Sequence, residues 1–377
     1  MKDVRFLHTA DWHIGKKLHG YDLLADQKDS IEKIIHLAQT EAVDAIVIAG
    51  DLYDRSVPSV EAVEMLNQKL IEINLEKALP ILAISGNHDS SGRLATGTPW
   101  FKQTNFHLHT QLKEAFVPIE MADTQFFLLP YFEPIAARLY FEDETLTTIQ
   151  AAMKRVIAEM VSLFDETKKQ VLVTHFFIAG GLRTDSETPI EVGGLNSVPA
   201  DLLDVFDYVA LGHLHSKNAL KKGKARYSGS PLKFSLSEIN DEKGVWIIDT
   251  EQMQPVFHPL TPLREMEKLE ASFEKLRQPT FYQTLNRETF WQIVLTDRAV
   301  IPNMMNQLRE VYPYILSVER LNGREASQPQ QERPREQNPQ QVVSTFFEEI
   351  TGETLTEKQF AWLSEGLQSA LDTEKRD

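Results

Sequence analysis

Cysteine is absent from the sequence, which has 377 residues. Without thiols the chain can form no disulfide framework, no thiolate zinc site, no iron–sulfur cluster and no cysteine nucleophile. This absence fits a reducing compartment, and we expect a cytoplasmic protein. Long apolar runs are also missing, because none approaches the ~18 residues that a membrane-spanning helix needs. The first ten residues include Asp3 and leave no room for a signal peptide, so we do not expect secretion.

Basic residues are in the minority. The sequence has 39 Lys and Arg against 55 Asp and Glu, which gives a net charge of −16 at pH 7. This balance argues against a protein that coats nucleic acid through a basic surface. It does not exclude a nucleic-acid enzyme, because some of the acids can be metal ligands. The composition, 42% hydrophobic and 25% charged, is that of a soluble globular chain with roughly two to three domains.

The first part of the chain alternates between short apolar segments and helical patterns. Strands are expected at Val4–His8, Ala45–Ala49, Ile81–Ile84, Val171–Val173 and Tyr208–Leu211. Helices are expected over Leu24–Ala42 and after Pro58, where Val63, Leu66, Leu70 and Ile73 recur at helical spacing. This alternation predicts a layered α/β fold. The apolar stripe Val63–Ile73 would suit either a dimer interface or a face that covers the sheet.

Each of the five predicted strands is followed by Asp, Asn or His. These residues are Asp11, His13, Asp51, Asn87, His88, His175, His213 and His215. In open α/β sheets, ligands bind where the carboxyl ends of the strands converge. One strand followed by such a polar residue would be an ordinary strand and turn. Five strands of this kind in one chain predict a common site.

The residue types in this set indicate a metal centre. Mixed carboxylate, amide and imidazole ligands suit a divalent ion such as Mn²⁺, with Mg²⁺ as an alternative, and so many imidazoles disfavour Ca²⁺. The ligands are too many for one tetrahedral ion and suit two ions that share a carboxylate. Such a pair binds phosphate oxygens and activates water for attack on phosphorus. His88 would stabilise charge or protonate the leaving oxygen, so the sequence predicts hydrolysis of a phosphate ester.

After Pro262 the pattern changes. A strand at Phe290–Leu295, a helix at Pro302–Val311 and an apolar segment at Tyr312–Leu316 predict a small α+β unit. Residues 327–341 contain prolines but no aliphatic or aromatic side chain, so a flexible linker is expected.

Two helices are expected beyond this linker. Val342–Ile350 is apolar, and Thr356 with Gln359 forms a capping box for a second helix. The second helix places four apolar residues on one stripe, namely Phe360, Leu363, Leu367 and Leu371. Such a hairpin has too little core to be stable alone. It docks either on its own chain or on a partner, and we favour the partner.

The polar motifs resemble the motif set of the calcineurin-like metallophosphoesterases in type, order and spacing. They are Asp11-Trp12-His13, Gly50–Arg55, Gly86–Asp89, Thr174-His175 and Gly212–His215. Within that superfamily the chain resembles the bacterial SbcD nucleases, the DNA-cutting subunits of SbcC–SbcD complexes. This narrower resemblance rests on Thr184–Leu195, Phe206–His215, Arg226–Glu238 and Leu308–Arg320, and it covers the chain except the linker.

The resemblance implies a role for each site residue. One ion would take Asp11, His13 and His215. The other would take Asn87, His175 and His213. Asp51 would bridge them and His88 would be the catalytic histidine. Asp54 stands where some relatives carry a second phosphate-facing His, and its carboxylate would orient His88. Alternatively, Asp54 pairs with Arg55 or caps the following segment.

The resemblance also implies an architecture and a function. We expect a layered metallophosphoesterase sandwich at 1–262, a small α+β capping domain at 263–323, a flexible linker at 324–341 and a helical hairpin at 342–377. The implied activity is that of a metal-dependent DNA nuclease, a 3′–5′ double-strand exonuclease and a single-strand and hairpin endonuclease. It would act on DNA ends in recombination and repair, as a homodimer with an SbcC-type ABC ATPase bound through 342–377. The alternatives are a small-molecule phosphoesterase and a metal-free scaffold, although no ligand is missing from the sequence.

Overall fold

The computed structural model describes residues 3–187, 197–220, 223–321, 340, 343–344, 346–347 and 354–374, the last of these with side chains to 367. The chain divides into two compact units: Met1–Thr296 with Asn303–Glu319, and Asp297–Pro302 with Arg320–Asp377. Among the described residues, no helix combines the length and apolar character needed to cross a bilayer.

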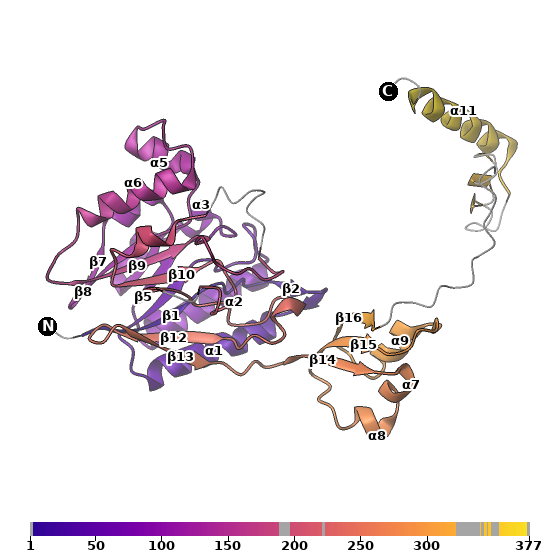
Figure 1. The fold of residues 1–377 in the computed structure, drawn as a ribbon, viewed down its shortest axis with the longest axis horizontal. Coiled ribbons are helices and arrows are strands. Elements are labelled where there is room, and N and C mark those ends of the chain that lie inside the picture. The colour runs from indigo at the N-terminus through magenta and orange to yellow at the C-terminus, as the bar shows by residue number, and fades with distance from the viewer. Residues whose placement is uncertain are drawn as a thin grey trace. The chain divides into compact units, whose positions relative to one another are not determined.

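The first unit contains a six-stranded sheet of order β13-β12-β1-β4-β5-β6 (Figure 1). Its strands are β1 (Arg5–Thr9), β4 (Ala45–Ala49), β5 (Ile81–Ile84), β6 (Phe106–His109), β12 (Gly244–Asp249) and β13 (Gln254–Pro259). Strands β1, β4, β5 and β6 are parallel, and β12 is antiparallel to both of its neighbours. The strands predicted at 45–49 and 81–84 are confirmed, and the one predicted at 4–8 lies one residue later.

A second sheet has five strands in the order β11-β10-β9-β8-β7. Its strands are β7 (Ile119–Met121), β8 (Thr124–Leu129), β9 (Lys169–His175), β10 (Tyr208–Gly212) and β11 (Ala225–Tyr227). Strands β8 to β11 are parallel, and β7 is antiparallel to β8. The predicted strands at 171–173 and 208–211 are confirmed as parts of β9 and β10.

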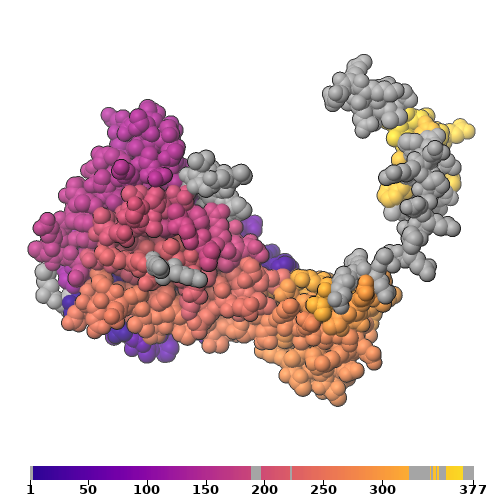
Figure 2. Space-filling view, in the orientation of Figure 1, coloured from indigo at the N-terminus to yellow at the C-terminus, as the bar shows by residue number. Residues whose placement is uncertain are grey.

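The two sheets face each other and helices cover their outer faces. On β4, Ala45, Val47 and Ala49 point into the cluster between the sheets, while Ile46 and Ile48 point to the helices. Helices α1 (Leu24–Thr40) and α2 (Val60–Ile71) cover the first sheet, and α5 (Pro134–Phe141) and α6 (Ile149–Val161) cover the second. The α5–α6 region forms the magenta surface at the top of Figure 2. Since both faces are covered at the central strands β4 and β5, these two strands are continuous apolar runs.

The apolar stripe predicted on the second helix, Val63–Ile73, covers the first sheet. Leu66 and Ile73 are buried in the cluster between α2 and the first sheet, and Val63 and Leu70 pack against it. The last residue of the stripe lies in a π-helical turn, Glu72–Glu76, that follows α2. Short elements complete this part of the chain: β2 (Lys17–Leu18), β3 (Tyr21–Asp22), α3 (Ser91–Leu94) and α4 (Thr98–Phe101).

A histidine joins the two sheets in the interior. His8 on β1 is completely buried, with Nδ1 3.0 Å from the Tyr208 hydroxyl and Nε2 3.2 Å from the Leu211 carbonyl oxygen, both on β10. A neutral ring satisfies both contacts, because Nε2–H donates to the carbonyl and Nδ1 accepts from the hydroxyl. Burial lowers the pKa of His8 from 6.5 to about 3, although the bond to Leu211 opposes this shift.

Acid should therefore destabilise the sandwich through His8. The unfolded chain protonates this residue below pH 6.5 and the folded chain does so only near pH 3, so the stabilisation present above pH 6.5 is lost as the pH falls. One such group lowers the free energy of unfolding by about 1.4 kcal/mol per pH unit. Urea unfolding of His8→Gln and of the parent chain, at pH 7 and pH 5, measures this effect. The variant should lose less stability between the two pH values, and equal losses would contradict the assignment.

A three-stranded sheet follows, in the order β14-β15-β16. Its elements are β14 (Met266–Ala271), α7 (Phe273–Leu276), α8 (Pro279–Tyr282), β15 (Phe290–Leu295), α9 (Met304–Arg309) and β16 (Ile315–Arg320). Its core includes Trp291, Leu308 and Tyr312. The strand predicted at 290–295 is confirmed. The helix predicted at 302–311 is shorter than expected, and β14 was not predicted.

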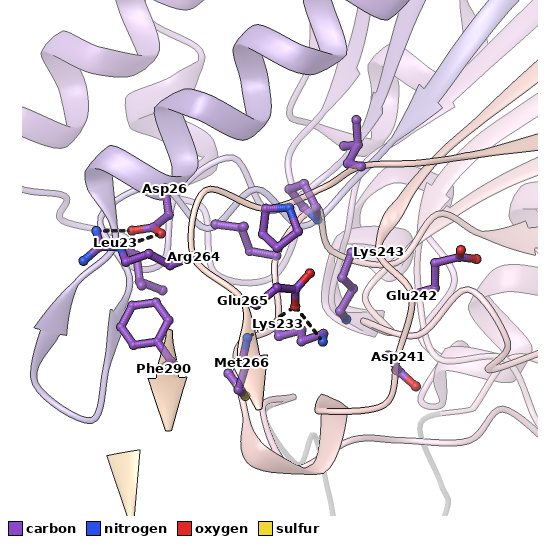
Figure 3. Close-up of a pocket in the computed structure, with 14 residues that line it drawn as sticks. Leu23, Asp26, Lys233, Asp241, Glu242, Lys243, Arg264, Glu265, Met266 and Phe290 are labelled. Atoms are coloured by element: carbon purple, nitrogen blue, oxygen red, sulfur yellow. Dashed lines mark hydrogen bonds and ion pairs between the residues drawn. The ribbon is translucent and has the colours of Figure 1, made fainter. Parts of the chain in front are cut away.

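An arginine connects this small sheet to α1. Arg264 donates from Nε and Nη2 to the two carboxylate oxygens of Asp26, at 2.9 and 2.6 Å, and the Asp26 side chain is buried (Figure 3). The guanidinium lies 4.8 Å from the ring centroid of Tyr314 and 5.1 Å from that of Phe290. A bidentate, stacked arginine holds both partners in one geometry, so it fixes the start of β14 on the first turn of α1.

The second unit contains α11 (Glu357–Glu374). The predicted capping box is confirmed, since Thr356 N lies 2.9 Å from Gln359 Oε1 and Gln359 N lies 3.4 Å from Thr356 Oγ1. The helix predicted at 342–350 is described at 343–344 and 346–347, which are helical. The predicted linker at 324–341 lies outside the described residues except for residue 340.

Candidate metal centre

The predicted site residues all lie at or just after the carboxyl ends of strands. Strands β1, β4 and β5 of the first sheet and β9 and β10 of the second supply them. The strand ends approach so closely that two glycines are required. A Cβ on Gly212 would lie 1.9 Å from the carbonyl oxygen of Ala49, and a Cβ on Gly86 would lie 2.2 Å from Asp51 Oδ1. The loops after the strands therefore meet without intervening side chains.

Four of the site residues have left-handed backbone conformations. Their φ angles are 54° for Asp11, 44° for His13, 53° for Asp51 and 99° for His213. Such angles cost about 1–3 kcal/mol each in non-glycine residues and persist only where the surrounding structure enforces them. Hydrogen bonds between the loops do so here: Asp11 N donates to Gly50 O at 3.1 Å, and His13 N to Asp51 O at 3.0 Å.

One group of ligand atoms is formed by Asp11, His13 and His215. Their ligand atoms lie within 4.8 Å of one another, and all three residues are buried. The Nε2 atoms of His13 and His215 face each other at 3.1 Å. Asp51 Oδ2 lies 3.5 Å from His13 Nε2, so the carboxylate of Asp51 borders this group.

A second group lies on the other side of Asp51. The Oδ2 atom of Asp51 is 3.3 Å from His175 Nε2. The side-chain oxygen of Asn87 is 3.0 Å from His175 Nε2 and also 3.0 Å from His213 Nδ1. The structure thus brings together all seven residues that the sequence predicts as ligands, with Asp51 between the two groups.

The histidines are suited to bind a cation. Burial lowers the pKa of His13 and of His215 well below 6.5 and lowers that of His213 to about 3, so these rings are neutral at pH 7. Two neutral rings whose Nε2 atoms face each other at 3.1 Å form a hydrogen bond when one Nε2 carries a proton and the other does not. When neither Nε2 carries a proton, both lone pairs point to the same place and a cation can accept them, so the donor set also fits a divalent metal ion.

The buried acids support the same interpretation. Burial and the adjacent Asp51 raise the pKa of Asp11 well above its ordinary value, although His175 opposes the shift. Burial also disfavours the charged form of Asp51, but the nearby His175 and His13 hold the pKa of its carboxyl well below the usual range. Burial likewise lowers the pKa of His175, yet Asp51, Asp11 and the hydrogen bond to the Ala49 carbonyl together raise that pKa to about 9. A divalent cation would neutralise the repulsion between the two carboxylates.

His88 lies beside these ligands. Its ring centroid is 4.8 Å from that of His13, and its backbone N–H donates to Asp51 Oδ1 at 2.9 Å. Nδ1 of His88 lies 2.8 Å from the main-chain carbonyl oxygen of Asp54. Asp54 thus contacts His88 through its backbone.

The carboxylate of Asp54 has other neighbours. It accepts a hydrogen bond from Lys16 Nζ at 2.7 Å and lies 3.8 Å from His13 Nδ1. It is also 3.8 Å from the guanidinium of Arg55, the ion pair considered as the alternative.

Sequence reasoning missed several polar residues that support the ligands. The carboxylate of Asp89 accepts hydrogen bonds from the backbone N–H groups of Leu52, Tyr53 and Gly86, so it ties the loop after β4 to the loop after β5. Ser186 and Glu187 contact His215. The predicted motifs included Asp89, and the segment that contains Ser186 and Glu187 was noted only for its resemblance to relatives. Part of that segment, 188–195, lies outside the described residues.

Comparison with known proteins gives consistent matches along the chain. The family model described as calcineurin-like phosphoesterase matches residues 4–217, and the one described as type 5 capsule protein repressor C-terminal domain matches residues 262–351. The SbcD subunit of the nuclease SbcCD from Staphylococcus epidermidis is 36% identical over 98% of this chain and 100% of its own length. The protein of the same name from Staphylococcus saprophyticus is 33% identical over 94% of this chain and 96% of its own.

Proposed function

Because the chain belongs to the calcineurin-like phosphoesterases, and among them to the family of SbcD subunits of SbcCD nucleases, we propose that it is a metal-dependent DNA nuclease. It hydrolyses phosphodiester bonds from duplex ends in the 3′–5′ direction and cuts single strands and hairpins. The observation that carries this proposal is the position of Asp51 between two groups of buried ligand atoms. That arrangement suits a pair of metal ions acting on one phosphate.

The ligand groups would divide between two ions. Asp11, His13 and His215 would hold one ion, Asn87, His175 and His213 would hold the other, and Asp51 lies between the two groups. Mn²⁺ suits this imidazole-rich set better than Mg²⁺, which prefers oxygen ligands and retained waters. When bound, the ions supply Lewis-acid stabilisation of the phosphate and a hydroxide nucleophile.

His88 would act on the leaving oxygen. The carbonyl oxygen of Asp54 can only accept a hydrogen bond, so Nδ1 of His88 carries a proton and donates to it. Nε2 would then be the ring atom that donates a proton or a hydrogen bond to the phosphate ester. The orientation of the ring depends on the main chain of Asp54.

This contact predicts different effects for two substitutions. His88→Ala should lower kcat by about 10²–10⁴-fold, the usual contribution of a general acid. Asp54→Asn keeps the main-chain carbonyl, so kcat should fall by less than about 10-fold. Steady-state cleavage of a labelled DNA duplex measures both values. An Asp54→Asn variant as impaired as His88→Ala would show that the carboxylate, and not the carbonyl, orients the histidine.

The chain would work within a larger assembly. The segment 342–377 binds an SbcC-type ABC ATPase. The full chain has a net charge of −16, so much of the contact with DNA is left to that partner. Exposed apolar side chains around α2, such as Val57, Val60 and Leu75, suit a homodimer contact. In this proposal residues 1–262 hold the catalytic site, residues 263–323 cap it, and 324–341 tether the hairpin.

A cleavage assay with the purified chain tests the function. Linear duplex DNA is incubated with Mn²⁺, with Mg²⁺ or with a chelator, and a chromogenic phosphodiester is run in parallel. Cutting of DNA that requires Mn²⁺ and is lost with chelator is the expected result. Hydrolysis of the small ester with intact DNA, also after addition of the ATPase partner and ATP, would contradict the nuclease and favour a small-molecule phosphoesterase.

A further inference from the structure

A buried polar cluster lies behind His215, on the side of the ring away from His13. Nδ1 of His215 is 2.5 Å from the hydroxyl oxygen of Ser186, and that hydroxyl is 2.5 Å from Glu238 Oε1. The carboxylate of Glu238 is paired with Lys243 Nζ at 2.6 Å. Glu238 is completely buried and Lys243 is 7% exposed, so this ion pair is shielded from water.

The donors and acceptors in this cluster determine which ring nitrogen of His215 carries the proton. The carboxylate of Glu238, ion-paired with Lys243, can only accept, so the hydroxyl proton of Ser186 is donated to it. The Ser186 oxygen is left as an acceptor for His215, whose Nδ1 must then carry a proton. Thr184 Oγ1, 3.0 Å from Ser186 Oγ, does not change this count, because its own proton has acceptors in Ser186, Glu187 and Glu238.

The main chain of His215 is held by the same cluster. Its backbone N–H donates to Glu187 Oε1 at 2.7 Å, and its carbonyl oxygen accepts from Lys243 Nζ at 2.8 Å. With both backbone groups fixed, the contact to Ser186 sets the rotation of the ring. Nε2 of His215 is thereby directed toward Nε2 of His13, and the two atoms are 3.1 Å apart.

We propose that Ser186, held by the Glu238–Lys243 ion pair, is a positioning residue that keeps the proton of His215 on Nδ1 and its Nε2 lone pair directed at the metal. The inference rests on the proposed metal-dependent function and names the residues that support one of its two metal groups. Hydrogen-bond partners behind a metal-binding histidine fix its tautomer and orientation, and their loss weakens metal affinity by about 10–100-fold. Because His215 is the one candidate ligand that Ser186 contacts among the described residues, its loss should affect one of two bound ions.

Calorimetric titration of the full chain with Mn²⁺ tests this assignment. The parent chain should bind two ions. In Ser186→Ala one dissociation constant should rise about 10–100-fold while the other stays within about 3-fold. Ser186→Thr keeps a hydroxyl at the same position and should restore the parent value. In the metal-free chain labelled with ¹⁵N-histidine, the signal that disappears in His215→Gln should show protonated Nδ1 in the parent and a mixture of tautomers in Ser186→Ala.

Ser235→Ala is the matched control. Ser235 donates to the same carboxylate oxygen of Glu238, at 2.8 Å, and within the described part of the chain it makes no hydrogen bond to His215. This variant should bind both ions as the parent does. Equal weakening in Ser235→Ala and Ser186→Ala would overturn the proposal, because the effect would then come from the loop as a whole.

Unchanged constants and an unchanged tautomer in Ser186→Ala would also overturn the proposal while leaving the nuclease function intact. A parent chain that binds no Mn²⁺ would overturn both. If the parent binds two ions but cuts no DNA, the nuclease proposal alone is contradicted. Weaker binding of one ion by Ser186→Ala would then still support the positioning role of Ser186.

Discussion

Asp51→Asn should reduce Mn²⁺-dependent cleavage of DNA by at least about 10³-fold, because loss of the shared carboxylate disturbs both ligand groups of a two-metal site at once. Asp51 lies within 3.5 Å of ring nitrogens from both groups, and its Oδ1 also accepts the backbone N–H of His88. Asparagine has nearly the same shape but carries no charge. Initial rates on a labelled duplex at saturating Mn²⁺, with calorimetry to count bound ions, measure the effect.

Two controls accompany this variant. Asp201→Asn removes an exposed carboxylate from the same unit and should leave the rate unchanged. The melting temperature of metal-free Asp51→Asn shows whether the variant is folded. An Asp51→Asn enzyme that is folded and keeps more than a tenth of the parent rate would exclude the shared-carboxylate role.

Deletion of residues 342–377 should abolish the complex with an SbcC-type ATPase and leave Mn²⁺-dependent cleavage by the isolated chain within about 3-fold of the parent. The reason lies in the side chains that this segment exposes. Phe360 and Trp362 on α11 are 45% and 61% exposed, and Phe346 is 62% exposed. Aromatic residues of this kind are the usual anchors of protein interfaces. Co-purification of the two proteins and cleavage assays of the truncated chain measure the two halves of the prediction.

A point variant refines the deletion experiment. Trp362→Ala should weaken binding of the ATPase by at least about 10-fold, as expected for a central aromatic anchor. Glu365→Ala, at an exposed position of the same helix, should have little effect. Continued co-purification of the truncated chain would mean that the ATPase binds elsewhere, and a large loss of cleavage would mean that the segment supports the catalytic body.

The central strands and the grouping of the candidate ligand residues could be predicted because the same physical cause produces both. Strands covered on both faces, such as β4, are unbroken apolar runs, so the first polar residue after each run marks the carboxyl end of a strand. Asp51 after β4 is found in this way, and so is the Thr174-His175 pair at the end of β9. Parallel pairing aligns the strand ends within each sheet, and the packing of the two sheets face to face brings the two sets of strand ends together.

Other features depend on contacts that the sequence does not encode locally. Strand β14 has the sequence Met-Glu-Lys-Leu-Glu-Ala, in which the charged residues obscure the strand pattern, and its pairing with β15 decides its conformation. The cluster of Ser186, Glu238 and Lys243 joins residues more than fifty positions apart. The role of Asp54 depends on which of its atoms meets His88, and residue type cannot reveal that.

The order of the strands has a consequence for synthesis of the protein on the ribosome. Strand β1 is made first, but one of its two neighbours in the sheet, β12, is translated after residue 243. The ligands are likewise spread from Asp11 to His215. A nascent chain therefore cannot complete either its first sheet or its ion-binding centre until most of the body has left the exit tunnel. Ion loading is then a late event, and a chain released before β12 would carry an open sheet edge that chaperones can recognise.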